Sequence, residues 1–528
     1  MLFVLAIRTK CATPASMLGD AGSSEMTVEA PYTRGRALQV SDVNAPSYMA
    51  VFDMSVDTSV VSGTSLYDGA AVIGTKVIFA PWNANNIGVF DLSTSSFTVS
   101  ASVAVSTANC VSACTTGSLT TTSNEFSGAA VVGHDKVIFA PFNSDWVGVY
   151  NVDHSTFDTS VSTSTAAVGL TDDGKFMGAA AVGTKVVFVP YNAGYVGVYD
   201  ASTATFDATA ASYGTSGDVG SDVQMFSGAA VWGTKVVFAP YASHKVGVYD
   251  VGTSILDTSV ATGTLTHGKK FRGAAVAGTK VVFAPFKSDY VGVLTFTSTF
   301  GSVSFAFDVV STGLTDNQKF DGAAIMNFRG QSRVIFAPYN ADVIGIYDVD
   351  ASTFDSETTG TLTDDQKFAG AVSAAVGTDS EVIFVTYRAG VVGRYSPSFD
   401  STVQSGSLTS DNKYSGAAAV GTKVVFAPST AAVVGVFDVS TGTFEANIGS
   451  TGTADGSADG SIVRKYSGAA AVGTKVVFAP HAAATVGVYD VATSTLTEHT
   501  PSGGLATSTV GCDGNAHAPP ISLLALRR

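Results

Sequence analysis

The chain has 528 residues, of which 45% are hydrophobic and only 13% charged, and its 28 basic and 43 acidic residues leave a net charge of −15. A surface of this sign repels phosphate backbones, which argues against nucleic acid as a partner. No run of 18 apolar residues occurs, so we expect no membrane-spanning helix. The 55 glycines and the many Val, Ile and Phe residues exclude a disordered chain and favour short strands joined by turns.

Residues 1–25 open with seven apolar residues followed by Arg8, and we predict either a targeting segment or a disordered one. Nothing in the chain indicates a cellular compartment. The cysteines are Cys11, Cys110, Cys114 and Cys512. Cys110 and Cys114 are either free thiols or a local disulfide. Because no second such pair and no adjacent histidine occurs, we expect no zinc site. We also expect no cofactor.

From residue 26 to residue 500 the sequence repeats itself, and this region is predicted to be one domain. A Gly-Ala-Ala-like element recurs at intervals of 45 to 59 residues. A period near 50 is typical of propellers and solenoids. The nine copies begin at Gly69, Gly128, Gly178, Gly228, Gly273, Gly322, Gly370, Gly416 and Gly468.

Each copy contains four short β segments and no helical spacing. The copy at Gly178 has "GAAAV", then "KVVFVP", then "VGVYD", then "TFDATA", each bounded by turn residues. Repeated units of four antiparallel strands predict an all-β fold, a single closed β-propeller. The first segment is small because innermost strands converge on the axis, and the Pro ends the second strand because it cannot donate to a ladder.

The unit resembles the kelch repeat in "GAAVVG", "KVIF", "VGVY" and the Thr-aromatic pair of "STF", from Tyr67 to about Thr500. The resemblance implies a propeller with about 50 residues per blade. The chain departs from the kelch pattern because Ala-Pro replaces the paired glycines after the second strand. Phe157, Phe206 or Phe354 also stands where a Trp is usual.

The ring is predicted to have nine or ten blades. "YMAVFDMSV", around Phe52, matches a fourth strand, so the N-terminal region holds one partial repeat beside the nine complete ones. The tail, 501–528, could supply the missing first strand through residues 503–511. A blade shared by both ends would remove exposed sheet edges. It could also bring Cys11 near Cys512 for a disulfide.

A lysine begins most second strands, and an Asp ends most third strands. The lysines could form an anion site, but cross-strand ion pairing is the interpretation we favour. In the seventh copy both members change together, and Glu381 is expected to pair with Arg394. The expected pairs are Lys76–Asp91, Lys185–Asp200, Lys235–Asp250, Arg333–Asp348, Lys423–Asp438 and Lys475–Asp490.

An aromatic residue follows the Pro, often with Asn after it, and opens the loop between the second and third strands. These residues either bind a ligand or partner on one face of the ring, or pack between blades with Asn holding the turn. The candidate partner-binding residues are Trp82, Asn83, Phe142, Asn143, Tyr191, Asn192, Tyr241, Phe286, Tyr339, Asn340 and Tyr387.

Acidic loops between copies, such as Asp172-Asp173, Asp316, Asp364-Asp365 and Asp411, are either calcium ligands or ordinary turns, and we favour turns. We find no Gly-x-Ser-x-Gly, HExxH or phosphate-binding loop, and no catalytic residue is assigned. We therefore predict a monomeric, non-catalytic binding or scaffold protein with a protein or glycan partner. The alternative is a propeller hydrolase, lyase or oxidoreductase with its site at the central channel, where one copy, such as the seventh, breaks the pattern.

Overall fold

A computed structural model describes residues 37–38, 66–84, 86–102, 124–163, 173–208, 224–263, 265, 268–299, 302–405, 412–449, 464–483 and 485–499. These residues form strands, turns and bends without any helix, and so no described helix could span a membrane. The four cysteines and the segments proposed for a tenth, shared blade around Phe52 and at 503–511 lie outside the described residues.

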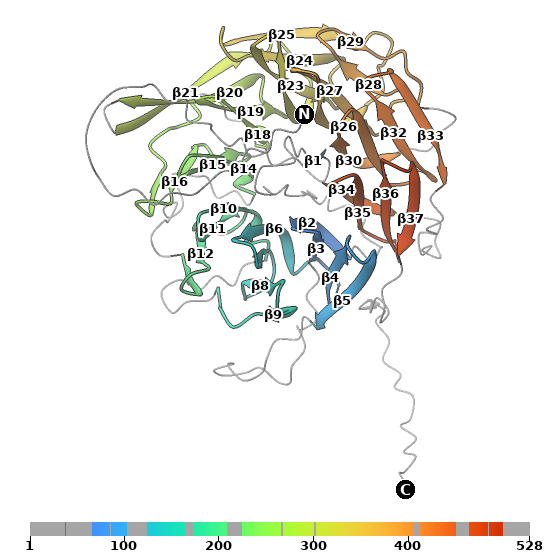
Figure 1. Cartoon of the computed structure of the whole chain (residues 1–528). Coiled ribbons are helices and arrows are strands. Elements are labelled where there is room, and N and C mark those ends of the chain that lie inside the picture. The colour runs from blue at the N-terminus through green and yellow to red at the C-terminus, as the bar shows by residue number, and fades with distance from the viewer. Residues whose placement is uncertain are drawn as a thin grey trace, which may run out of the picture.

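Nine sheets of four consecutive antiparallel strands are arranged in a ring (Figure 1). The fold is therefore an all-β propeller, and of the two blade numbers expected, nine is the one that the structure shows. Each sheet runs in chain order from an inner strand near the axis to an outer strand at the rim.

The inner strands carry the Gly-Ala-Ala elements, and most second strands end at Pro as predicted. The inner strands are β2 (Tyr67–Ile73), β6 (Phe126–Val132), β10 (Phe176–Val182), β14 (Phe226–Trp232), β18 (Phe271–Ala277), β22 (Phe320–Phe328), β26 (Phe368–Val376), β30 (Tyr414–Val420) and β34 (Tyr466–Val472). The second strands are β3 (Lys76–Pro81), β7 (Lys136–Pro141), β11 (Lys185–Pro190), β15 (Lys235–Pro240), β19 (Lys280–Pro285), β23 (Gln331–Pro338), β27 (Asp379–Thr386), β31 (Lys423–Pro428) and β35 (Lys475–Pro480).

The third and outer strands vary more in length. The third strands are β4 (Asn86–Asp91), β8 (Gly148–Asn151), β12 (Gly197–Asp200), β16 (Gly247–Asp250), β20 (Tyr290–Thr299), β24 (Val343–Asp348), β28 (Gly393–Tyr395), β32 (Val433–Asp438) and β36 (Val486–Asp490). The outer strands are β5 (Ser96–Ser102), β9 (Thr156–Asp158), β13 (Thr205–Asp207), β17 (Ile255–Asp257), β21 (Ser302–Ser311), β25 (Thr353–Thr358), β29 (Phe399–Asp400), β33 (Thr443–Gly449) and β37 (Thr495–His499).

Close approach of the inner strands explains their small residues. Gly69 has φ +101°, and a Cβ placed there would lie 3.0 Å from the Cα of Gly128 in the next blade. Only glycine fits without strain at such a position. Outside this narrow ring, apolar clusters between neighbouring blades form the core. One such cluster joins Tyr67 and Phe79 of the first blade to Tyr466 and Phe478 of the ninth.

The Phe residues that replace the expected Trp pack within their own blades. Phe157 of β9 lies 6.1 Å from both Phe126 and Phe139, measured between ring centroids. Phe206 and Phe354 make equivalent contacts in the third and sixth blades. The outer strand is thus held to the two strands beneath it by aromatic packing.

The predicted register between the second and third strands is confirmed. Each of the six Lys or Arg residues lies opposite the predicted Asp. Ion-pair distances are 2.7 Å for Lys76–Asp91 and 2.6 Å for Lys235–Asp250. In the seventh blade Glu381 accepts two hydrogen bonds from Arg394, of 2.6 and 2.8 Å, as expected.

One upstream segment lies near the axis rather than in a blade of its own. The two-residue strand β1 (Ala37–Leu38) pairs in parallel with β30, with Ala37 opposite Ala417 and Leu38 opposite Ala418. This stretch belongs to the predicted partial repeat, yet β1 extends the eighth sheet. An inner strand has one unpaired backbone edge, so a passing extended segment can add to it.

Candidate functional site

A continuous circle of backbone hydrogen bonds runs around one face of the ring. In each blade, the backbone N–H of the residue before the inner strand donates to the backbone carbonyl of the residue that follows the second strand of the preceding blade. The carbonyl of the donating residue in turn accepts from the N–H of the residue that follows the second strand of its own blade. All these bonds are 2.7–3.0 Å long. The bond from Leu66 N to the His481 carbonyl, 2.8 Å, joins the first blade to the ninth and closes the circle.

We call this circle the belt and its side of the ring the belt face. Its residues before the inner strands are Leu66, Glu125, Lys175, Met225, Lys270, Lys319, Lys367, Lys413 and Lys465. Its residues after the second strands are Trp82, Phe142, Tyr191, Tyr241, Phe286, Tyr339, Tyr387, Ser429 and His481. All seven aromatic candidates from the sequence therefore belong to one structural element.

The belt aromatics pack on one another rather than standing out as separate contacts. Six of the seven are buried and Tyr339 is half-buried. Ring centroids are 4.9 Å apart for Trp82–Phe142 and 6.0 Å apart for Phe142–Tyr191. The series resumes with Phe286, Tyr339 and Tyr387 at 6.5 Å spacings. Their apolar surface thus contributes mainly to contacts between blades.

The candidate asparagines join each blade to the next. The Asn83 Oδ1 accepts from the backbone N–H of Asn124, at 2.8 Å. Asn143, Asn192 and Asn340 accept in the same way from Gly174, Gln224 and Gln366, at 2.8–3.0 Å. The four donors have φ between 60° and 73°, so the asparagine side chains hold tight turns of the neighbouring blade rather than their own.

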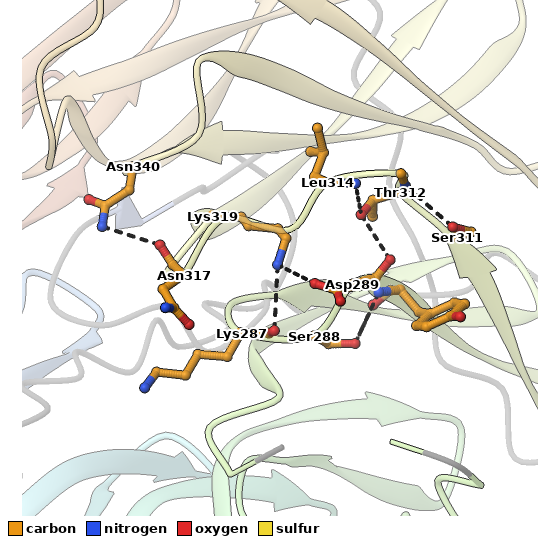
Figure 2. A network of polar contacts seen from close by, with 11 residues as sticks. Lys287, Ser288, Asp289, Ser311, Thr312, Leu314, Asn317, Lys319 and Asn340 are labelled. Carbon is orange, nitrogen blue, oxygen red and sulfur yellow. Dashed lines mark hydrogen bonds and ion pairs between the residues drawn. The ribbon is translucent and has the colours of Figure 1, made fainter. Parts of the chain in front are cut away.

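The belt also contains six buried lysines that we did not identify as site residues from the sequence. Lys319 is an example in which the side chain crosses to the fifth blade (Figure 2). Its Nζ donates to the Lys287 carbonyl at 3.5 Å and to the Asp289 carboxylate at 2.8 Å. Lys367 similarly reaches Asp342 at 2.8 Å and two carbonyls. These lysines could have been found from the sequence, because each directly precedes the aromatic residue that begins an inner strand.

The pattern of the belt changes at the eighth and ninth blades. Ser429 and His481 replace the aromatic residue. Gly390 and Ala432 occupy the loop positions that Asp289 and Asp342 hold in the fifth and sixth blades. The next lysines therefore reach backbone oxygens at these loops, since Lys413 donates to the Arg388 carbonyl at 3.0 Å and Lys465 to the Ala431 carbonyl at 2.8 Å.

Two arginines lie in the blades on either side of Ser429, Arg388 in the seventh and Arg464 in the ninth. Arg464, an exposed residue that begins the ninth blade, donates from Nη2 to the Tyr387 hydroxyl of the seventh blade at 3.2 Å. Arg388 is half-buried at the loop position that Asn83 and Asn340 hold elsewhere, and its Nε has no hydrogen-bond partner in the described part of the chain. The Ser429 hydroxyl is buried and likewise unpartnered there. We call Tyr387, Arg388, Ser429 and Arg464 the arginine site.

Burial changes the ionisation of two belt residues of the ninth blade, His481 and Lys465. Burial and the nearby Arg464 charge lower the pKa of His481 to about 4, so the imidazole is neutral at pH 7. Burial also lowers the pKa of Lys465, although the Glu498 carboxylate opposes this shift.

The acidic turns, considered above as possible calcium sites, have exposed carboxylates in the described part of the chain. Asp173, Asp316, Asp364 and Asp365 are exposed, whereas Asp172 and Asp411 lie outside the described residues. No group of three or more His, Cys, Asp or Glu side chains that could hold a metal ion occurs among the described residues.

These features define a nine-bladed β-propeller with a belt on one face. No protein-family model matches the chain, and no curated protein resembles it. The resemblance to kelch repeats therefore stays a prediction.

Several solved structures are similar. A virginiamycin B lyase from Staphylococcus aureus is 13% identical over 57% of this chain and 90% of its own, with a TM-score of 0.36. AztD from Citrobacter koseri is 10% identical over 70% and 95%, with a TM-score of 0.39. Dihydro-heme d1 dehydrogenase NirN is 9% identical over 74% and 75%, with a TM-score of 0.41. Similarity this low says nothing about activity.

Proposed function

We propose that this propeller is a non-catalytic binding protein whose protein or glycan partner presents an acidic group to the arginine site. The observation that supports this most is the break in the belt. Where seven blades place an aromatic ring, the eighth places Ser429. Arg464 of the ninth blade there reaches the hydroxyl of Tyr387 in the seventh blade, the residue next to Arg388.

The chemistry of these groups fits a carboxylate or sulfate. A guanidinium offers a planar fork of donors that matches two oxygens of such an anion. A buried donor without a partner costs about 1–3 kcal/mol, so a ligand oxygen reaching the Arg388 Nε or the Ser429 hydroxyl would remove that cost. Tyr387, one of the sequence candidates, contributes the hydroxyl that orients Arg464.

The enzyme alternative drew on the seventh copy, and its Glu381 has another role here. The Glu381 carboxylate accepts hydrogen bonds from Arg394 and from the Ser396 hydroxyl within the same blade. It therefore acts as the local ion-pair partner in a blade that lacks the usual Lys and Asp. A binding role needs only the arginines and the rigid frame that holds them.

Binding is tested with two acidic probes, a uronic-acid oligosaccharide and a Glu-rich peptide, each beside a neutral counterpart. Calorimetry on the full chain should show binding of at least one acidic probe and none of the neutral ones. Arg388→Gln and Arg464→Gln should each weaken that binding at least about tenfold because each removes a charge-assisted contact.

Arg329→Gln is the matched control, because Arg329 is exposed in the turn between the first two strands of the sixth blade. It makes the same charge change away from the belt and should leave affinity unchanged. Equal losses in all three variants, or equal binding of neutral probes, would contradict the proposal. Cleavage of a probe would favour the enzyme alternative.

A further inference from the structure

The outer edge of the fifth blade differs from that of every other described blade. Its strands β20 and β21 pair over ten residues each, whereas no other described outer strand exceeds seven. Thr295 replaces the usual Asp opposite Lys280, and the hairpin continues past that point through Phe296–Thr299. Figure 1 shows it extending outward at the left of the ring.

The extension is held in place by aromatic contacts from the fourth blade. Trp232, at the end of β14, stacks on Phe296 with centroids 4.2 Å apart and ring planes 2° from parallel. The indole N–H of Trp232 donates to the Gly278 carbonyl at 3.2 Å, and Phe296 contacts Phe305 of β21. The edge strand is thus fixed before any partner arrives, which lowers the entropy lost on binding.

This edge is also where apolar side chains are exposed. The exposed large hydrophobic residues of the described chain are Ile255 (60%), Val309 (41%), Val303 (39%) and Tyr290 (36%). All four lie in β17, β20 or β21, on two neighbouring blades. The one charged residue of β21 is Asp308. Long edge strands without proline, bulge or several charges can pair with another strand.

The sequence of β21 is symmetric in a way that selects its partner. In "SVSFAFDVVS", Val303 and Val309, and likewise Phe305 and Phe307, are equally spaced on either side of Ala306. If a two-fold axis passes through Ala306, antiparallel pairing places Val303 opposite Val309 of the partner subunit. Phe305 then lies opposite Phe307 of the partner subunit. Residues directly opposite share a face, so this register forms one apolar row.

The other face of β21 is compatible with the same register. Ser304 would lie opposite Asp308 of the partner subunit, which allows a hydrogen bond and keeps the two Asp308 carboxylates from facing each other. A surface that complements itself about a two-fold axis is the requirement for a symmetric dimer.

We propose that β21 is a dimerisation edge that pairs antiparallel with β21 of a second copy of this chain, in the register centred on Ala306. Two blades would then form one continuous eight-stranded sheet between two rings. The belt faces remain outside this contact, so the proposal is independent of the arginine site. It also replaces the monomer that the sequence alone favoured.

Sedimentation of the full chain across a range of concentrations tests the association. The wild-type chain should show a monomer–dimer equilibrium, and Val309→Lys should weaken it at least about tenfold because an ammonium group then enters the apolar row. Val309 is already 41% exposed, so the melting temperature should not change at concentrations where both chains are monomeric. A wild-type chain that stays monomeric throughout, or a variant that dimerises as tightly, overturns the proposal.

Cysteine cross-linking tests the register. Ala306→Cys places a thiol opposite its own copy and should give a covalent dimer on mild oxidation, above the background of the wild-type cysteines. Ser304→Cys, two residues away on the same face, should not, since its two copies would be offset by four residues. Cross-linking of Ser304→Cys without Ala306→Cys would overturn the register.

Discussion

The belt between the fifth and seventh blades and the belt at the eighth and ninth blades solve the same structural problem with different residues. In the first region Lys319 and Lys367 each bond a carboxylate and carbonyls of the preceding blade, beside packed aromatic rings. In the second, Lys413 and Lys465 reach carbonyls at loops where Gly390 and Ala432 replace Asp.

The comparison shows that the backbone circle does not need the aromatic rings or the carboxylates. Its hydrogen bonds are as short at Ser429 and His481, 2.8 Å, as at Tyr339. Side chains at these positions can therefore change without opening the ring. The eighth blade lacks the aromatic ring, and the arginines of the site come from the seventh blade (Arg388) and the ninth (Arg464). A binding site can arise where one copy loses a packed side chain, because the contacts of the neighbouring copies still hold the backbone in place.

The largest effect that separates the two regions should come from truncating a packed aromatic. Phe286→Ala, in the fifth blade, removes a buried ring that packs on Tyr339 and should lower the free energy of unfolding by about 3–5 kcal/mol. Ser429→Ala, at the equivalent position of the eighth blade, removes only an unpartnered hydroxyl and should change it by less than about 1 kcal/mol. Urea denaturation measures both, and equal losses would show that the two regions are packed alike.

A smaller effect is expected from pH, through His481. The pKa of its imidazole is about 4 in the folded chain, against an ordinary value of 6.5 once the chain unfolds, so the unfolded chain binds the proton more readily. Stability from the neutral imidazole is complete above pH 6.5 and is lost as pH falls toward 4, by about 3 kcal/mol. Denaturant titrations of the wild type and His481→Gln should diverge in slope across this window, and parallel curves would contradict the buried neutral state.

The smallest difference should lie in the lysines themselves. Lys319→Met leaves the Asp289 carboxylate and a carbonyl without their ammonium partner and should cost about 2 kcal/mol, moderated because Asp289 is 41% exposed. Lys465→Met loses one carbonyl contact and an ammonium whose pKa burial already lowers, so it should cost about 1 kcal/mol. Thermal melts of both variants give the ranking, and a reversed order would show that the carboxylate contributes little.

Much of the fold was predictable because it depends on contacts between neighbours in the chain. The repeat period predicted blades, the Pro and Gly positions predicted strand ends, and the Lys and Asp positions predicted the register of the second and third strands. All of these are local rules of antiparallel pairing. The candidate site was predicted less well, because the same aromatic could face solvent or a neighbouring ring, and sequence spacing does not distinguish the two.

Several features depend on which blades become neighbours in space. Arg464 and Tyr387 are 77 positions apart and meet only because the eighth blade carries a serine between them. The bond from Leu66 to His481 exists only because nine blades complete the circle.

The sequence by itself therefore determined that this chain folds into a propeller of four-stranded blades, because the residues within each copy set the strand lengths, the turns and the register. The tertiary structure decided the number of blades, the burial of the belt aromatics and the position of the arginine site. The physical reason is that closure and packing between blades depend on the angle and contacts of whole sheets, which no single copy encodes.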